Sequence, residues 1–299
     1  MQTANLNRAW IDVFITALAP AIWGSTYIVT TQVLPPGLPF TAALLRTVPA
    51  GLLLLLGTRR LPAAGQGGRL LVLSALNIGA FQALLFVAAY RLPGGLAAVV
   101  GSMAPLWVMG LAWGVDARRP TGPCLLACVC GVLGMAALLI SSAAVWDTLG
   151  VAAALAGTAC MATGTFLARR WQTSLPVLAF TGWQLLLGGL MLAPLVWVTE
   201  PSLPRLTLTQ GLGYAYLSLV GALLAYALWF RGVARLPSVA VSSLGLLSPL
   251  TAVLLGWSLL GQSLTAWSLV GLLTVLASVL AVQWATQTSR PPHGVMRQT

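Results

Sequence analysis

The chain has 299 residues, of which 59% are apolar and only 6% are charged. Soluble domains carry roughly 25% charged residues on average, so this composition excludes a water-soluble fold. The net charge of +11 comes from 15 arginines, which stand singly or in pairs between apolar runs. Nucleic-acid binding needs a continuous basic surface, and these scattered arginines do not provide one.

Ten apolar runs, separated by Arg, Pro and Gly, predict ten membrane-spanning helices. Each run approaches the roughly 20 residues that cross a hydrocarbon core about 30 Å thick. The first run is too long for the apolar core of a signal peptide, so we expect it to be the first span. The predicted spans are residues 12–33, 39–57, 70–90, 93–115, 121–141, 148–168, 176–198, 210–230, 237–260 and 265–286. The sequence therefore predicts an all-α integral membrane protein with short loops.

The arginines predict how the chain is oriented, because short loops that carry positive charge stay in the cytoplasm. With a cytoplasmic N-terminus, only Arg91 and Arg205 lie outside, and Arg46 lies within a span. The cytoplasmic side then receives Arg8, Arg59, Arg60, Arg69, Arg118, Arg119, Arg169, Arg170, Arg231, Arg235, Arg290 and Arg297. We expect both termini in the cytoplasm. The use of Arg without any Lys points to a bacterial source, and hence to a bacterial inner membrane.

An internal repeat divides the chain. Four residues, Arg91, Gly101, Pro105 and Trp113, recur 144 positions later as Arg235, Gly245, Pro249 and Trp257. Earlier in the halves, Pro39 recurs 137 positions later as Pro176. We expect two five-helix halves, residues 1–145 and 146–299. An odd number of spans per half inserts the second half upside down, and such inverted repeats are typical of secondary transporters with a substrate site near the midplane.

The chain has few residues of the types that can bind a metal or form a disulfide. Cys124, Cys128, Cys130 and Cys160 fall inside predicted spans, where cysteine packs as a small apolar residue. The single histidine, His293, stands in the C-terminal tail, away from these cysteines. Zinc sites need several such ligands close together. We therefore expect no metal, no cofactor and no disulfide framework.

Several motifs resemble the drug/metabolite transporter superfamily, whose members have ten spans and two EamA-like halves. The first span contains Ala-Ile-Trp-Gly-Ser at 21–25 and the second contains Arg46; the fourth and ninth spans open with Arg-Leu-Pro and continue to a mid-span proline. The resemblance covers nearly the whole chain and is strongest to the YddG-type exporters of aromatic amino acids. It implies that this protein exports amino acids or related metabolites across a bacterial inner membrane.

Arg46 is the charged residue that the sequence places well inside a span, where a charge costs at least about 2.5–3.5 kcal/mol. Its guanidinium could hold the carboxylate of a substrate through two parallel hydrogen bonds. Alternatively, Arg46 could extend toward the outer interface, or tie helix ends together through backbone carbonyls. The sequence leaves both interpretations open.

The four acidic residues, Asp12, Asp116, Asp147 and Glu200, all fall at predicted span ends. Proton-coupled carriers usually place a titratable side chain inside the helix bundle. The sequence therefore favours facilitated diffusion over obligatory coupling to protons.

The other candidate substrate-binding residues are apolar or amide side chains at mid-span depth. Pro105 and Pro249 occupy equivalent positions, where each is expected to interrupt its helix near the binding level and to serve as a gating kink. Met103, Trp107, Phe166 and Trp183 could line an apolar cavity that stacks a ring, although helix packing or lipid contact explains each of them as well. Asn77, Gln82, Gln184 and Ser243 could bind a polar headgroup, or could bond across helices.

Other functions fit the sequence less well. A membrane-embedded enzyme would need clustered carboxylates, a nucleophile with its base, or metal ligands, and the spans carry none of these. A receptor or scaffold would be expected to present a long loop. Among transporters, carriers of cationic drugs, purines or sugars remain alternatives. We expect a small-molecule substrate and the lipid bilayer as partners; the oligomeric state is open, and a monomer is compatible with the sequence.

Overall fold

The structure, a computed structural model, describes residues 2–91, 94–139, 147–171, 173–261 and 263–288. Leu92 and Pro93 of the first Arg-Leu-Pro motif, His293, Arg290, Arg297 and the predicted boundary at 145/146 lie outside the described residues. The described part contains helices and no strand. Ten helical stretches are long and apolar enough to cross a membrane, and they match all ten predicted spans. The all-α membrane fold is therefore confirmed.

Five spans are continuous helices. These are α1 (Gln2–Gln32), α2 (Pro39–Thr58), α7 (Gly122–Leu139), α8 (Thr148–Arg170) and α15 (Ala266–Thr288).

The other five spans are built from shorter pieces. The third joins α3 (Gly67–Ser74), the π-helix η1 (Ala75–Gly79) and α4 (Ala80–Arg91), and the eighth joins α11 (Leu208–Ser218), the π-helix η2 (Leu219–Leu224) and α12 (Ala225–Arg235). The fourth is α5 (Gly94–Gly101) and α6 (Ala104–Asp116), the seventh α9 (Val177–Leu190) and α10 (Ala193–Thr199), and the ninth α13 (Ser238–Leu244) and α14 (Leu247–Leu260).

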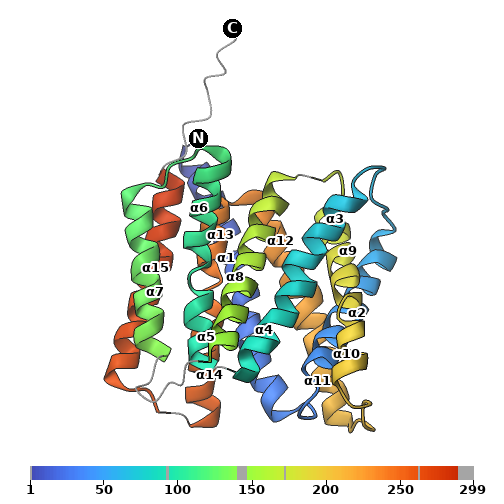
Figure 1. The fold of residues 1–299 in the computed structure, drawn as a ribbon. Helices are drawn as coiled ribbons and strands as arrows, with labels where there is room; N and C mark the ends of the chain where they lie inside the picture. Colours follow the sequence, from blue (N-terminus) through green and yellow to red (C-terminus); the bar gives the residue numbers. More distant parts are fainter. Residues whose placement is uncertain (1, 92–93, 140–146, 172, 262, 289–299) are drawn as a thin grey trace.

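Successive spans run in opposite directions between two faces of the bundle (Figure 1). We call the face where α1 begins and α15 ends the terminal face, and the opposite one the far face. Loops 59–66 and 117–121 lie on the terminal face, and loops 33–38 and 200–207 lie on the far face. Consequently α1 and α8, the first spans of the two predicted halves, run in opposite directions, as do α2 and α9.

The interruptions of the third, fourth, eighth and ninth spans occur at matching positions in the two halves, whereas the break in the seventh span has no counterpart in the continuous α2. The π-helices begin at Ala75 and Leu219, which are separated by the same offset as Pro105 and Pro249 in the sequence repeat. The fourth span breaks at residues 102–103, before Pro105, and the ninth at residues 245–246, before Pro249. Proline lacks a backbone N–H and is tolerated in the first turn of a helix, so each proline stands near the start of a new segment.

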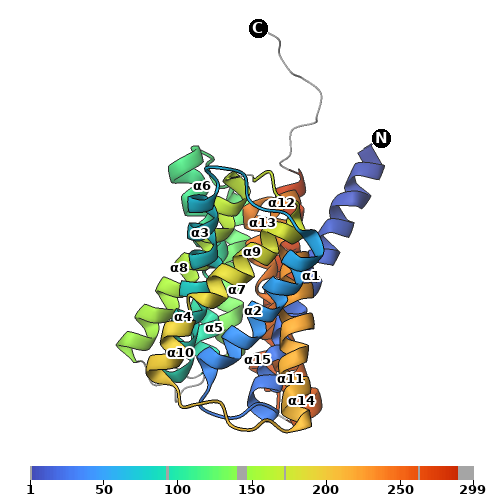
Figure 2. The ribbon, with the colours of Figure 1, turned by 90° about the vertical axis from the view of Figure 1, so that its right-hand side faces the viewer.

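The contacts between spans also correspond in the two halves. α2 packs on α9, and α7 packs on α15; α1 contacts α12 and α14, just as α8 contacts α4 and α6. Figure 1 shows α7 beside α15 at one edge of the bundle, and Figure 2 shows α2 and α9 side by side on the face turned to the viewer. Exchanging the two halves maps this set of contacts onto itself. This correspondence, together with the opposite directions of α1 and α8, is what the predicted inverted repeat requires.

Small residues allow the closest of these contacts. Gly134 on α7 and Gly271 on α15 meet at the crossing of the two helices: a Cβ added to Gly271 would lie 2.6 Å from the carbonyl oxygen of Gly134. Close backbone approach at small residues is typical of helix packing in membranes, where no hydrophobic effect drives helices together.

Replacing this glycine should destabilise the bundle. Gly271→Ala places a methyl group against backbone atoms of α7 that cannot move aside, and we expect a loss of about 1–3 kcal/mol in unfolding free energy. The matched control is Gly110→Ala on α6, where an added Cβ meets nothing within 4 Å. The measurement is thermal unfolding in detergent; a melting temperature of Gly271→Ala as high as that of the control would contradict the packing described.

Candidate functional site

Arg46 binds the middle of the eighth span. Its side chain extends from α2, and Nη2 donates a hydrogen bond to the carbonyl oxygen of Gly221 at 2.9 Å. Gly221 belongs to η2 and lies halfway along the span Leu208–Arg235. The indole Nε1 of Trp23 on α1 donates to the same oxygen at 3.1 Å. A carbonyl oxygen has two lone pairs, so one backbone group of the second half anchors two side chains of the first.

The remaining contacts of Arg46 are incomplete. The guanidinium carbon lies 5.9 Å from the centroid of the Tyr226 ring, at a distance suited to a cation–π interaction. Its Nε is buried and has no hydrogen-bond partner among the described residues. A backbone carbonyl and an aromatic face reduce the cost of the charge but do not neutralise it. The guanidinium therefore keeps an unpaired N–H and a charge that none of the four carboxylates contacts.

The contacts of Arg46 agree with one part of the second interpretation of this residue and differ from the rest of it. The side chain does not reach for the outer interface. It does bond to a backbone carbonyl, as the second interpretation expected, but at mid-span rather than at a helix end. A charged group at this depth still carries a large desolvation cost.

Tyr226 connects Arg46 to a polar and aromatic centre. Gln82 Nε2 on α4 donates to the Tyr226 hydroxyl at 3.4 Å, and both side chains are buried. The Tyr226 ring centroid lies 4.9 Å from that of Trp23 and 6.1 Å from that of Phe230. Gln82 and Tyr226 are separated by the repeat offset of the third and eighth spans, so equivalent positions of the two halves touch each other here. Such a contact marks the line where the halves meet.

A second buried polar pair lies between the third and seventh spans. Asn77 Nδ2, in η1, donates to Gln184 Oε1 on α9 at 2.8 Å. Gly164 on α8 makes room for the amide, since an added Cβ there would lie 2.8 Å from Asn77 Cγ. Gln184 is fully buried, and its Nε2 has no hydrogen-bond partner among the described residues. The pair bonds across helices, yet it keeps a donor for a further group.

The remaining predicted residues do not join this centre. Met103 and Trp107 are 40% and 49% exposed, and Trp107 Nε1 donates to Thr163 on α8 at 3.2 Å. Trp183 Nε1 donates to the Arg60 carbonyl at 3.0 Å and so reaches a loop of the terminal face. Phe166 is buried on α8.

The hydroxyl of Ser243 on α13 already has two hydrogen-bond partners. Its hydroxyl donates to the Ala240 carbonyl at 2.9 Å and accepts from Gln283 Nε2 at 3.0 Å. The structure therefore divides the candidate residues among several separate contacts.

Sequence reasoning missed Tyr226 and the two π-helices. Tyr226 is an aromatic residue among many in an apolar run, and nothing in its neighbours marks it. The repeat carried a signal, however, because Tyr226 is the repeat equivalent of Gln82, one of the candidates. Pairing candidates by the repeat offset would have found it.

All four acidic residues contact other groups at span ends. Asp12 pairs with Arg231 at 2.6 Å and Arg235 at 3.3 Å, and Asp116 pairs with Arg170. Asp147 caps α8 by accepting from the Gly150 N–H and lies 3.6 Å from Arg91, and Glu200 accepts from the backbone N–H groups of Phe40 and Thr41. None of these four carboxylates stands at the depth of Arg46.

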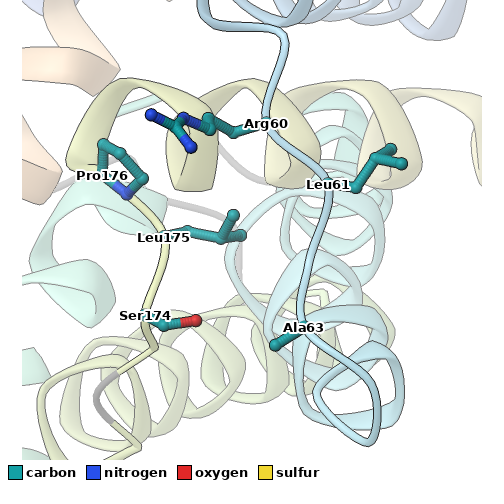
Figure 3. Close-up of a pocket in the computed structure, with 6 residues that line it drawn as sticks. All are labelled: Arg60, Leu61, Ala63, Ser174, Leu175 and Pro176. Atoms are coloured by element: carbon teal, nitrogen blue, oxygen red, sulfur yellow. The ribbon is translucent and has the colours of Figure 1, made fainter.

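The structure also contains a cavity of about 410 Å³ on the terminal face (Figure 3). It is lined by Arg60, Leu61, Ala63, Ser174, Leu175 and Pro176, from loop 59–66 and the segment before α9. None of the predicted site residues lines this cavity. It therefore belongs to the junction between two loops and not to the centre around Arg46.

Comparisons with known proteins agree with this architecture. The chain is 43% identical to protein PecM of Dickeya dadantii over 274 residues, which cover 91% of this chain and 92% of that protein. It is 28% identical to the uncharacterized transporter YwfM of Bacillus subtilis (91% and 94% covered) and 25% identical to a probable amino-acid metabolite efflux pump of Salmonella typhimurium (90% and 93% covered).

A solved structure has the same fold, with a TM-score of 0.77 at 16% identity, covering 92% of this chain and 98% of the other. The sequence model of the EamA-like transporter family matches twice, at residues 10–140 and 148–284, so each match spans one set of five helices. The chain belongs to the EamA-like transporter family.

Proposed function

We propose that this protein is an alternating-access transporter that exports small organic solutes bearing a carboxylate, foremost aromatic or large neutral amino acids and related metabolites. The observation that carries the proposal is Arg46, a permanently charged donor at the middle of the membrane that lacks a counter-ion within the described spans. A substrate carboxylate supplies that counter-ion, and a charge-assisted pair in this apolar setting is strong.

The surroundings of Arg46 support a ring-bearing substrate. Tyr226 presents its ring beside the guanidinium, and Trp23, whose ring lies 4.9 Å from that of Tyr226, bonds to the same Gly221 oxygen as Arg46. Aromatic side chains bind rings of a ligand with defined geometry. A relative at 25% identity bears the name of a probable amino-acid metabolite efflux pump, and this is consistent with the substrate class.

The composition of the spans disfavours the alternatives. Carriers of cationic drugs need an acidic group in the bundle, and the four carboxylates lie at span ends in ion pairs or helix caps. Carriers of nucleotide sugars need several basic groups for the phosphates. Within the described spans Arg46 is the single arginine placed at mid-span, so it suits one carboxylate.

The first prediction concerns binding by Arg46. In counterflow, liposomes that contain the protein and unlabelled phenylalanine should accumulate labelled phenylalanine above empty liposomes. Arg46→Ala removes a charged hydrogen-bond donor, and we expect at least about tenfold slower accumulation, corresponding to the roughly 1.5–3 kcal/mol of a hydrogen bond to a charged group.

Arg205→Ala, in an exposed loop on the far face, is the matched control and should transport as the unsubstituted protein does. Both variants are first shown to be monodisperse and equally heat-stable. Normal counterflow by Arg46→Ala would remove the proposed role of this arginine, whereas no counterflow by the unsubstituted protein would overturn the amino-acid assignment.

The second prediction concerns energy coupling. Because the acidic residues lie outside the membrane interior, transport should follow the substrate gradient at equal pH on both sides. We expect the same initial rate in proteoliposomes with and without an imposed pH gradient. Transport that requires the imposed gradient would show that a proton is carried after all.

The third prediction concerns orientation. The terminal face carries Arg59, Arg60, Arg69, Arg118, Arg119, Arg169, Arg170, Arg231 and Arg235, and the far face carries Arg91 and Arg205. We therefore propose that the terminal face is cytoplasmic in a bacterial inner membrane. A cysteine at Gln66 should react with a membrane-impermeant maleimide in inverted vesicles and stay unlabelled in intact spheroplasts; the reverse pattern would invert the topology.

A further inference from the structure

The far face closes by a contact between the two halves. Glu200 directly follows α10, and its two carboxylate oxygens accept hydrogen bonds from the backbone N–H groups of Phe40 at 2.5 Å and Thr41 at 2.8 Å. These groups belong to the first turn of α2, whose own N-cap residue, Leu38, supplies no side-chain hydrogen bond. A negative group at a helix N-terminus also interacts favourably with the helix dipole. The second half therefore caps the helix that carries Arg46.

The equivalent junction on the terminal face is bridged by Trp183, which bonds to the Arg60 carbonyl, but it has no carboxylate cap and encloses a cavity. Pro176, at the start of α9, corresponds to Pro39 at the start of α2, and Arg59 directly follows α2 as Glu200 directly follows α10. Pro176 supplies no side-chain cap for α9, and Ala63 and Pro176 line the cavity of about 410 Å³ shown in Figure 3. Where the far face has a carboxylate between two spans, the terminal face has space.

Contacts next to these two junctions also differ between the far face and the terminal face. On the far face Gly213 on α11 packs so closely on the end of α1 that an added Cβ would lie 3.0 Å from Leu34. Ala42 and Tyr214 are buried in the same cluster. The residues equivalent to Gly213 and Leu34 on the terminal face are Arg69 and Trp171, whose guanidinium and ring stand 6.0 Å apart. The far face is thus packed and capped, and the terminal face is held by longer side chains.

We propose that Glu200 is the latch of the far-face gate. Its carboxylate must leave the Phe40 and Thr41 N–H groups before the second and seventh spans separate on that face. Since α2 carries both these N–H groups and Arg46, the same movement exposes the arginine to the far side. This inference rests on the proposed alternating-access transport and adds to it the residue that holds one of the two gates.

The test measures how often the far face opens, by the reactivity of a buried cysteine. Ala42→Cys is introduced after Cys124, Cys128, Cys130 and Cys160 are replaced by alanine, and a membrane-impermeant maleimide is added from the far side. Ala42 is only 6% exposed, so labelling requires opening. Glu200→Ala should raise the labelling rate about five- to thirtyfold, the population shift that follows from losing a charged helix cap. Glu200→Gln, which keeps one acceptor oxygen, should give an intermediate rate.

Thr207→Ala is the matched control. Thr207 caps α11 on the same face, but through Gln210 within its own helix, so its loss weakens a cap without releasing the two halves. We expect its labelling rate to equal that of the protein with Ala42→Cys alone. A second reporter, Leu45→Cys in the same cluster, serves if Ala42→Cys does not fold.

Two outcomes overturn the latch: labelling that is unchanged in Glu200→Ala, and labelling that rises equally in Thr207→Ala. Labelling needs no substrate, so its result is independent of counterflow. Fast labelling of Glu200→Ala together with absent phenylalanine counterflow would support the latch while removing the proposed substrate. Normal counterflow with unchanged labelling would support the proposed substrate and overturn the latch.

Discussion

A single backbone carbonyl at the middle of the membrane holds the centre of this protein together. The oxygen of Gly221 accepts hydrogen bonds from Arg46 and Trp23, so the second half binds the first two spans of the first half at the depth where water is absent. Hydrocarbon offers polar groups no partners, and each must be satisfied within the protein. The Gly221 carbonyl in the π-helix η2 and the aromatic ring of Tyr226 are the groups that face this charge, and the Gln82 amide bonds to the Tyr226 hydroxyl.

The number, order and limits of the spans were predictable because the membrane imposes a simple rule on sequence. Apolar stretches of fixed length are required wherever the chain crosses, and the ten stretches read from the sequence match the ten helical spans within a few residues. The paired interruptions near Pro105 and Pro249 were also predictable, since proline cannot continue the backbone hydrogen bonds of a helix. The π-helices were not, because residues 75–79 and 219–224 contain no proline or other residue that marks a change in the backbone hydrogen bonds.

Prediction of the site was less complete. Arg46 stood out because a charge inside a span is costly, and Asn77, Gln82 and Gln184 stood out as buried amides; the structure places Arg46 and Gln82 in one network and Asn77 with Gln184 in another. The contacts of Trp107 and Trp183 could not be predicted, since the sequence does not show whether an aromatic residue packs against a helix, faces lipid or bonds to a loop. Which side chains meet depends on the rotation of each helix, and a run that is apolar on every side does not reveal that rotation.

The connection between the seventh and eighth spans has a consequence for the balance between the conformations. Glu200 is the first residue of this connection, whereas Arg59 is the first residue of the equally long connection between the second and third spans. In an inverted repeat with identical halves, exchanging the conformations of the halves converts the inward-open state into the outward-open state, and the two have equal energy. Only positions at which the two halves differ can make one of these two states more stable than the other. The Glu200 carboxylate caps α2 on the far face, and Pro176 gives α9 no such cap on the terminal face. Under the proposed alternating access, this difference stabilises the state that is closed at the far face.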